Sequence, residues 1–198
     1  MDPKPLLVFD LDGTLIYATR APPPHYDFAF TLQNITFYIR KRPGLDDFLQ
    51  WCRQHFKLAV WSAGSPDYVQ AIVKELFPKD DLAFVFTAEQ TTRCVYDQGR
   101  EVIHRKYLRK AWLHLNWVWN YSNTRILDDN PDTYTGNVSN ALEIESWSGD
   151  DKDDSELTWI MCNLNHFKAA CAIKLTPLEE VSLERNDGRL IPITSSGE

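Results

Sequence analysis

A buried-strand pattern that runs directly into two carboxylates constrains this chain more than any other feature. Leu6-Leu7-Val8-Phe9 is a continuous apolar run, and Asp10-Leu11-Asp12-Gly13-Thr14 follows it at once. Continuous apolar runs of this length are typical of strands covered on both faces, as in parallel sheets, and Asp and Gly then favour a turn. The pattern therefore predicts an acidic loop at the carboxyl end of a buried strand.

Asp10 and Asp12 lie two positions apart, so we expect both carboxylates on the same side of this loop. Neighbouring carboxylates repel each other, and a positive group between them relieves the repulsion. A hard divalent cation with oxygen ligands is the simplest candidate, and Mg²⁺ is the expected ion. Taken alone, the pair is equally compatible with ordinary turn chemistry.

The length and composition fit one globular domain. The chain has 198 residues and a formal net charge of −7, which argues against a nucleic-acid groove because phosphate neutralisation requires clustered Lys and Arg. Its apolar runs are far shorter than the roughly 20 residues of a membrane span, and Met1-Asp2-Pro3-Lys4 lacks the features of a signal peptide. We expect a cytoplasmic or nuclear protein without a membrane span. The sequence leaves its oligomeric state open.

The cysteines and histidines show no metal-binding pattern. No pair of cysteines has the CxxC spacing and the five histidines are scattered, so neither a zinc site nor a disulfide framework is indicated. Reduced thiols are typical of the cytoplasm and the nucleus. The four cysteines are Cys52, Cys94, Cys162 and Cys171.

Apolar periodicity predicts strands that alternate with helices. Residues 28–39 alternate on both sides of Gln33-Asn34, which predicts a β-hairpin. Further strands are expected at 56–61, 83–86 and 124–127, and helices after Pro43-Gly44, after Ser65-Pro66, at 105–117 and from about Glu156 to Phe167. This alternation implies an α/β fold with a doubly wound parallel sheet. We expect one domain over residues 1–175 and a loosely docked or frayed tail over 176–198.

Polar groups follow three of the predicted buried strands. Asp10 and Asp12 follow the first strand, Ser62 follows the second, and Asp128 and Asp129 follow the third. Because the carboxyl ends of the strands line the ligand crevice of an open α/β sheet, we expect these side chains to converge. Turn chemistry does not explain the full ordered set.

In this order the residues resemble the haloacid dehalogenase superfamily of phosphotransferases, which carries DxDxT, then Ser or Thr after a strand, then Lys, then an acidic pair. Here the order reads Asp10 to Thr14, Ser62, Lys106 and Asp128-Asp129. Within the superfamily the chain is similar to the NLI-interacting-factor-like family, which includes phosphatases of the RNA polymerase II C-terminal domain. That likeness is carried by Arg40 to Leu49, Lys106 to Trp112, Leu127 to Pro131, and Trp147 with Asp153 to Leu157.

The acidic residues have distinct expected roles in phosphoryl transfer. Asp10 is the expected nucleophile, and Asp12 would protonate the leaving oxygen and later accept a proton from water. Mg²⁺ is expected on Asp10, the backbone carbonyl of Asp12, and Asp129, where it would cancel charge on nucleophile and phosphate. Asp128 is expected to orient the catalytic lysine.

Ser62 and Lys106 complete the predicted site. Ser62 would hydrogen-bond a phosphoryl oxygen, and Lys106 would neutralise the charge that develops in the transition state. Lys110 lies one helical turn after Lys106 and is the alternative phosphate-contacting lysine. A helix cap is the alternative role for Ser62, although Ser65 is better placed for it.

The segments between these motifs are too short for a separate lid. Between Asp12 and Ser62 we expect only the hairpin and one helix, and between Ser62 and Lys106 only a helix, a short strand and a loop. This predicts a small β-hairpin flap, no large cap domain, and an open crevice that admits a phosphorylated side chain on a polypeptide. The aromatic residues available either for an apolar wall or for packing on the sheet are Phe28, Phe30, Phe37 and Tyr96.

The sequence thus predicts a Mg²⁺-dependent phosphatase that hydrolyses phosphomonoesters through an aspartyl-phosphate intermediate. Its expected substrate is phosphoserine or phosphothreonine in a phosphorylated protein or peptide. One alternative is a capless phosphatase for small phosphoesters or nucleic-acid ends. A second alternative is a non-catalytic binding module with the same fold, against which the intact Asp10, Asp12, Lys106 and Asp129 argue.

Overall fold

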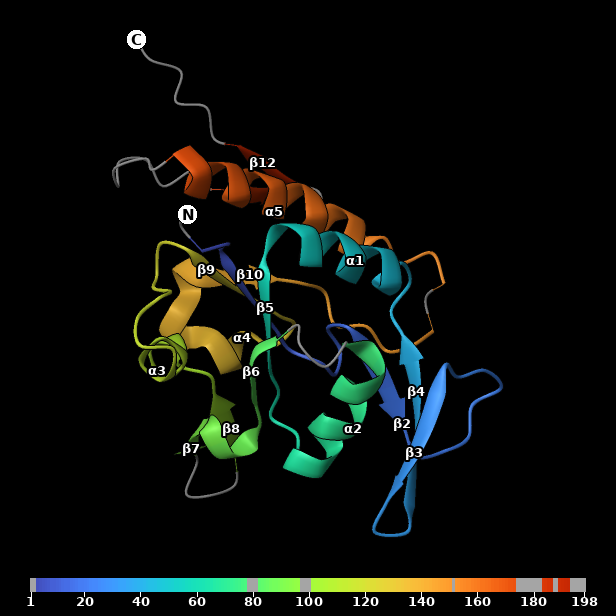
Figure 1. Cartoon of the computed structure of the whole chain (residues 1–198). Helices are drawn as coiled ribbons and strands as arrows, with labels where there is room; N and C mark the ends of the chain where they lie inside the picture. Colours follow the sequence, from blue (N-terminus) through green and yellow to red (C-terminus); the bar gives the residue numbers. More distant parts are fainter. Residues whose placement is uncertain are drawn as a thin grey trace.

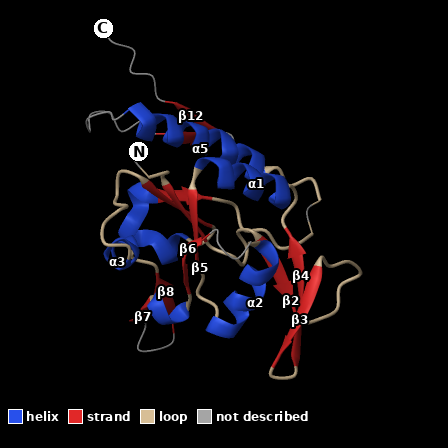
Figure 2. Ribbon diagram, viewed as in Figure 1, coloured by secondary structure: helices blue, strands red, loops and turns tan. Residues whose placement is uncertain are grey.

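A five-stranded parallel sheet with the strand order β10-β9-β1-β5-β6 forms the centre of the molecule (Figures 1 and 2). The computed structural model describes residues 3–77, 82–96, 101–150, 152–173, 183–186 and 189–192. The sheet strands are β1 (Leu6–Phe9), β5 (Lys57–Trp61), β6 (Leu82–Phe86), β9 (Thr124–Asp128) and β10 (Ala141–Glu143). All four neighbouring pairs are parallel. The predicted α/β fold is confirmed.

Helices cover both faces of this sheet. Leu7 and Phe9 of β1 lie in one core cluster with α1 (Leu45–His55), α2 (Pro66–Leu76) and α5 (Glu156–Ile173). Leu6 and Val8 lie in a second cluster with α3 (Leu108–His114). Figure 1 shows α1 and α5 side by side on the first face. Burial on both faces explains why β1 is apolar at every position.

A smaller antiparallel sheet, β2-β4-β3, stands beside the central sheet on the side away from α3 (Figure 2). β3 (Phe28–Leu32) and β4 (Ile35–Lys41) form the predicted hairpin. Gln33 and Asn34 between them have φ values of 46° and 68°, the conformation that tight two-residue hairpin turns require. β2 (Ile16–Thr19) pairs with the other edge of β4 and was not predicted, because its four residues carry no alternating pattern.

The segment before α3 differs from the prediction. A loop was expected there, but β7 (Thr92–Tyr96) and β8 (Glu101–Arg105) form an antiparallel hairpin after the short helix η1 (Ala88–Gln90). The predicted helix over 105–117 is shorter, because Asn116 and Trp117 adopt positive φ values of 52° and 58° beyond its end. At its other end α3 begins only at Leu108, so Lys106 precedes the helix instead of lying on it.

Two short helical segments, α4 (Pro131–Tyr134) and η3 (Thr135–Asn140), connect β9 to β10. Near the end of the chain, β11 (Leu183–Asn186) pairs antiparallel with β12 (Arg189–Pro192). The remainder of the predicted tail over 176–198 lies outside the described residues, and the domain boundary at 175 stays a prediction. No helix in the described part of the chain has the length and apolarity needed to cross a membrane.

Candidate active site

The carboxyl ends of β1 and β9 bring three of the predicted residues together. Asp10 follows β1 directly, and Asp128 is the last residue of β9, which pairs with β1 in parallel. Asp10, Asp128 and Asp129 each place a carboxylate oxygen within 4.8 Å of the other two. β1 is flanked by β5 on one side and by β9 on the other, which is the position where open α/β sheets bind their ligands.

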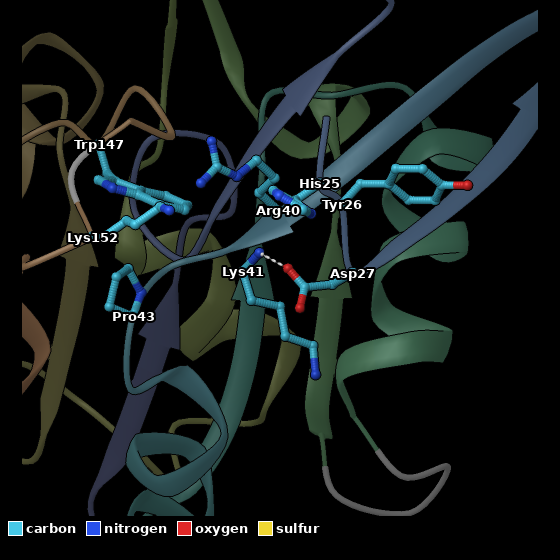
Figure 3. A pocket seen from close by; sticks show the side chains of 8 residues that line it. All are labelled: His25, Tyr26, Asp27, Arg40, Lys41, Pro43, Trp147 and Lys152. Atoms are coloured by element: carbon cyan, nitrogen blue, oxygen red, sulfur yellow. Dashed lines mark hydrogen bonds between the residues drawn. The ribbon is translucent and has the colours of Figure 1, made fainter. Parts of the chain in front are cut away.

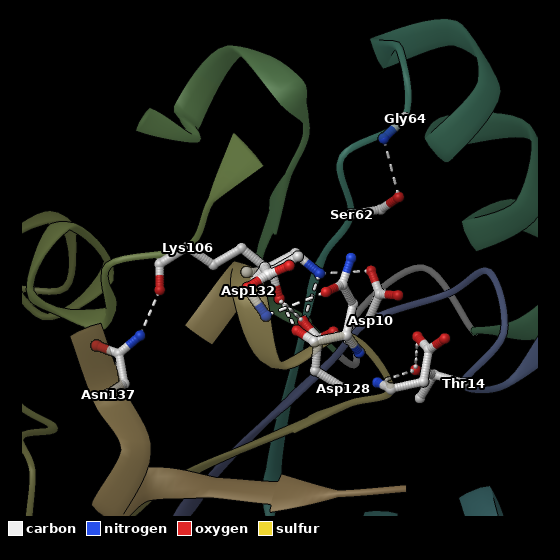
Figure 4. Close-up of polar contacts among 11 residues, drawn as sticks. Asp10, Thr14, Ser62, Gly64, Lys106, Asp128, Asp132 and Asn137 are labelled. Carbon is white, nitrogen blue, oxygen red and sulfur yellow. Dashed lines mark hydrogen bonds and ion pairs between the residues drawn. The ribbon is translucent and has the colours of Figure 1, made fainter. Parts of the chain in front are cut away.

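Lys106, which follows β8, extends its ammonium group into this carboxylate cluster (Figure 4). Its Nζ donates to Asp10 Oδ1 at 2.6 Å and to Asp128 Oδ2 at 2.7 Å, and its side chain is 1% exposed. Burial disfavours the ammonium form, but the two carboxylates outweigh this effect and raise the pKa of Lys106. The lysine therefore stays charged at neutral pH.

Lys110, the alternative lysine, lies away from the cluster. Its Nζ donates to the backbone carbonyl of Gln90 at 3.0 Å on the exposed side of α3. The contacts thus favour Lys106, because it alone of the two lysines bonds to Asp10 and Asp128.

Asp10 needs a further positive charge to act as a nucleophile. Burial raises the pKa of its carboxyl to about 8; Asp128 and Asp12 add to the shift, whereas Lys106 opposes it. An attacking carboxylate must be ionised, and a cation bound beside it would favour the ionised form.

The cluster offers the ligands that a hard divalent cation prefers, because all of its potential ligand atoms are carboxylate oxygens. Asp128 is already engaged: Oδ2 accepts from Lys106 and from Thr133 Oγ1, and Oδ1 accepts from the backbone N–H of Asn130. Asp10 and Asp129 are therefore the better placed ligands. The predicted role of the Asp12 backbone carbonyl stays a prediction.

Asp129 is held by the loop that carries the nucleophile. Thr14 Oγ1 donates to Asp129 Oδ1 at 3.0 Å and accepts from the Asp129 backbone N–H at 3.1 Å. Gly13 has φ +79°, and a Cβ atom there would collide with the Asp129 carboxylate. Glycine thus supplies both the backbone conformation and the space that this contact requires. The acidic loop and the acidic pair form one unit.

Asp12 lies outside the cluster and is bound by a residue that sequence reasoning missed. Its Oδ1 accepts a hydrogen bond of 2.5 Å from the hydroxyl of Tyr68 in α2, 56 positions along the chain. Although the Asp12 side chain reaches solvent, partial burial raises the pKa of its carboxyl, and the Tyr68 hydrogen bond opposes the rise. A raised pKa suits a group that must protonate a leaving oxygen.

Ser62 directly follows β5 and is buried. Its Oγ accepts from the backbone N–H of Gly64 at 3.0 Å, which orients the hydroxyl within its own turn (Figure 4). Ser65 occupies the N-cap position of α2 as expected, but its side chain forms no capping hydrogen bond. The contact of Ser62 with a phosphoryl group stays a prediction.

The family model of the NLI interacting factor-like phosphatases matches residues 5–174. The chain belongs to this family. It is 29% identical over 175 residues to CTD small phosphatase-like protein 1 of Caenorhabditis elegans, covering 86% of this chain and 33% of that protein. It is 30% identical over 161 residues to human CTD small phosphatase-like protein, covering 78% of this chain and 52% of that protein. The chain thus spans between a third and about half of these two relatives.

A solved structure of Fcp1, described as an essential RNA polymerase II CTD phosphatase, shares the fold. The TM-score is 0.57 at 20% sequence identity, covering 84% of this chain and 50% of the Fcp1 chain. At this level of identity the likeness supports the fold alone.

Aromatic side chains of β3, β4 and α2 gather beside Asp12. Phe30 stacks on Phe37 with ring centroids 5.5 Å apart, and both rings contact Tyr68 at 5.7 Å and 5.2 Å. Two of the predicted wall residues are therefore next to the residue that bonds Asp12. Phe28, Phe30, Phe37 and Tyr68 all pack against the main core cluster as well.

Tyr96, the fourth candidate, belongs to β7 and lies under the Arg105 guanidinium, 5.5 Å from the ring centroid. This contact with Arg105 lies within the β7-β8 hairpin.

A pocket of about 260 Å³ lies at the open end of the β3-β4 hairpin, where β3 begins and β4 ends (Figure 3). Within it the backbone N–H of Lys41 donates to Asp27 at 2.7 Å, while the ammonium of Lys41 bonds Asp46. Its lining residues are His25, Tyr26, Asp27, Arg40, Lys41, Pro43, Trp147 and Lys152. None of them belongs to the carboxylate cluster, so this pocket is separate from it.

Proposed function

We propose that this protein is a Mg²⁺-dependent phosphatase that hydrolyses phosphomonoesters through an aspartyl-phosphate on Asp10. The observation that carries the proposal is the buried ammonium of Lys106 held between Asp10 and Asp128, with Asp129 beside them. Membership of a family whose relatives are named phosphatases supports it.

In the first step, a carboxylate oxygen of Asp10 attacks phosphorus while the bond from phosphorus to the leaving oxygen breaks. Asp12 donates its proton to that oxygen, and the raised pKa of Asp12 favours the protonated form needed. Lys106 neutralises charge that develops on the phosphoryl oxygens, and Ser62 donates a hydrogen bond to one of them.

In the second step, Asp12 is a carboxylate and takes a proton from a water molecule, whose oxygen attacks phosphorus. The bond from phosphorus to Asp10 breaks, which releases inorganic phosphate and restores the Asp10 carboxylate. Asp128 keeps its hydrogen bond with Lys106 throughout and so holds the ammonium in place.

Asp10 and Asp129, with the backbone carbonyl of Asp12, would hold Mg²⁺. When bound, the ion supplies charge neutralisation for the nucleophile and the phosphate. The all-oxygen donor set supports this choice of a hard cation.

We infer that the substrate is phosphoserine or phosphothreonine in a protein or peptide. The names of the relatives, CTD small phosphatase-like protein 1 and CTD small phosphatase-like protein, support a phosphorylated protein substrate. The aromatic wall of Phe30, Phe37 and Tyr68 beside Asp12 also supports it, because it offers apolar surface for residues that flank the phosphorylated side chain.

A cytoplasmic or nuclear location is part of the proposal. The four cysteines are all unpaired, which is typical of a reducing compartment.

Asp10→Asn tests the assigned nucleophile. We expect wild-type protein to hydrolyse p-nitrophenyl phosphate with Mg²⁺, to lose activity in EDTA, and to regain it when Mg²⁺ is restored. The side-chain amide of the variant cannot form the phosphoenzyme, so activity should fall at least about 10³-fold. Circular dichroism serves as the control for folding. Wild-type-like turnover by the folded variant would refute Asp10 as the nucleophile.

A further inference from the structure

Lys106 lies in a short connection with no regular structure of its own. β8 ends at Arg105, and α3 begins at Leu108. Tyr107 occupies the N-cap position of α3 but forms no side-chain capping bond. Since the first N–H groups of a helix lack partners within the helix, this start needs a hydrogen-bond acceptor from elsewhere.

Asn137 of η3 supplies that acceptor and a donor as well. Its Oδ1 accepts from the backbone N–H of Leu108 at 3.0 Å, and its Nδ2 donates to the backbone carbonyl of Lys106. One buried side chain therefore spans the main chain on both sides of Tyr107. Figure 4 shows the Asn137 amide turned towards the Lys106 backbone.

The local conformation of η3 is adapted to this contact. Asn137 departs from helical geometry, with φ −141° and ψ 33°, and its side chain bonds the connection before α3. At the preceding residue, Gly136, a Cβ atom would overlap the ring of Tyr107. The absence of a side chain at Gly136 thus permits the close approach of the two segments.

The same part of the chain also holds the other end of Lys106. The backbone N–H of Lys106 donates to the Thr133 carbonyl at 2.7 Å, and Thr133 Oγ1 donates to Asp128 Oδ2 at 2.8 Å. Asp128 Oδ2 in turn accepts from Lys106 Nζ. Lys106 is therefore held at its amide, at its carbonyl and at its ammonium by residues 128–137.

From this geometry we propose that Asn137 is a positioning residue, which fixes the backbone of Lys106 so that its ammonium stays on Asp10. The inference rests on the proposed phosphatase function. A lysine side chain is long and flexible, so the position of its ammonium depends on where its backbone is anchored. A misplacement of about 1 Å at a reacting group can cost about 10²-fold in rate.

Asn140 offers a matched control. It is also a buried asparagine of η3, and its Nδ2 donates to the backbone carbonyls of Tyr121 at 2.7 Å and Thr124 at 2.9 Å. Asn140→Ala thus removes two comparable hydrogen bonds that do not involve Lys106.

We expect Asn137→Ala to lower kcat for p-nitrophenyl phosphate by about 10- to 100-fold in the folded enzyme. Inhibition by vanadate, which imitates the transferring phosphoryl group, should weaken by about tenfold, because its charge is neutralised by Lys106. Asn140→Ala should lower the melting temperature but leave kcat and the vanadate Ki within about twofold of wild type. A loss of folded protein would not move Ki, so this readout separates positioning from stability.

Asn137→Asp is a second variant in case the alanine variant does not fold. Its carboxylate keeps an acceptor for the Leu108 N–H but cannot donate to the Lys106 carbonyl, so the same losses of kcat and vanadate affinity are expected. Wild-type kcat and Ki in either folded Asn137 variant, or equal losses in Asn140→Ala, would overturn the inference. An inactive wild-type enzyme would instead reject the proposed phosphatase function.

Discussion

In the proposed mechanism, Asp12 changes its protonation state twice in each catalytic cycle. It has to be protonated when the leaving oxygen departs and ionised when water attacks. Burial raises the pKa of Asp12, and the hydroxyl of Tyr68 opposes the rise because it donates to the ionised carboxylate. Tyr68 therefore limits the rise in the pKa of Asp12, in addition to its contacts with Phe30 and Phe37.

Tyr68→Phe should move the pH dependence of this proton transfer in a defined direction. The variant keeps the ring but loses the hydrogen bond, so the pKa of Asp12 should rise further. A general acid is active below its pKa, and the alkaline limb of the kcat profile should therefore move to higher pH. Phenyl phosphate is the substrate to use, because its poor leaving group needs the acid.

The control for that experiment is p-nitrophenyl phosphate, whose better leaving group depends less on protonation and should show a smaller displacement. An alkaline limb that moves to lower pH, or that stays in place with phenyl phosphate, contradicts the role assigned to Tyr68.

At the scale of the elements, Arg42 joins three parts of the fold around the active site. Its side chain is 1% exposed and bonds both carboxylate oxygens of Asp154, at 3.0 Å and 2.7 Å. The same guanidinium donates to the backbone carbonyls of Gly13 and Thr14 in the acidic loop. Asp154 also accepts from the N–H of Glu156 at the start of α5. Arg42, directly after β4, thus connects the acidic loop to the start of α5.

Arg42→Met should destabilise the protein by about 3–5 kcal/mol, because it leaves the Asp154 carboxylate buried without its partner. The measurement is the free energy of unfolding in urea. Adding Asp154→Leu to Arg42→Met should restore part of the loss, since no unpaired charge then remains buried.

Lys41→Met is the matched control at the adjacent position. Lys41 bonds Asp46 at 2.8 Å, but Asp46 is 76% exposed, and surface pairs of this kind contribute only about 0–1 kcal/mol. Equal losses in the Arg42 and Lys41 variants would contradict the importance assigned to the buried pair.

At the scale of the whole molecule, the described elements include no folded lid domain beside the carboxylate cluster. The chain between β1 and β5 forms β2, the β3-β4 hairpin and α1, and between β5 and Lys106 it forms α2, β6 and the β7-β8 hairpin. β7 and β8 are an addition to what was expected, but they make a two-stranded sheet and not a cap domain. A site without a lid gives up water exclusion and can accept a side chain on a polypeptide.

Substrate class should follow this architecture. We expect kcat/KM for a proline-containing phosphoserine peptide to exceed that for sugar phosphates by at least about tenfold, because only the peptide can use the apolar wall beside Asp12. The comparison requires parallel assays of phosphate release. Phe37→Ala should reduce the preference for the peptide but retain turnover of p-nitrophenyl phosphate. A higher kcat/KM for sugar phosphates would favour the capless small-substrate alternative.

Much of the fold was predictable because its strands and helices carry strong local patterns. The apolar run of β1 and the paired turn residues Gln33-Asn34 depend on nearest neighbours and burial, and both predictions are confirmed. The β7-β8 hairpin was missed, because only pairing between its strands distinguishes it from a polar loop. The end of α3 was misplaced, because its apolar stripe continues into residues with positive φ.

The sequence by itself determined which residues gather at the sheet edge, because parallel strands place their carboxyl ends together whatever the details of packing. Asp10, Asp128 and Asp129 are therefore close in space, as expected. Lys106, which only the family resemblance indicated, reaches them from the connection between β8 and α3. Only the tertiary structure decided which partner each residue takes. Tyr68 on Asp12 and Asn137 on Lys106 come from distant segments with no motif of their own, and such contacts depend on how helices dock against the sheet.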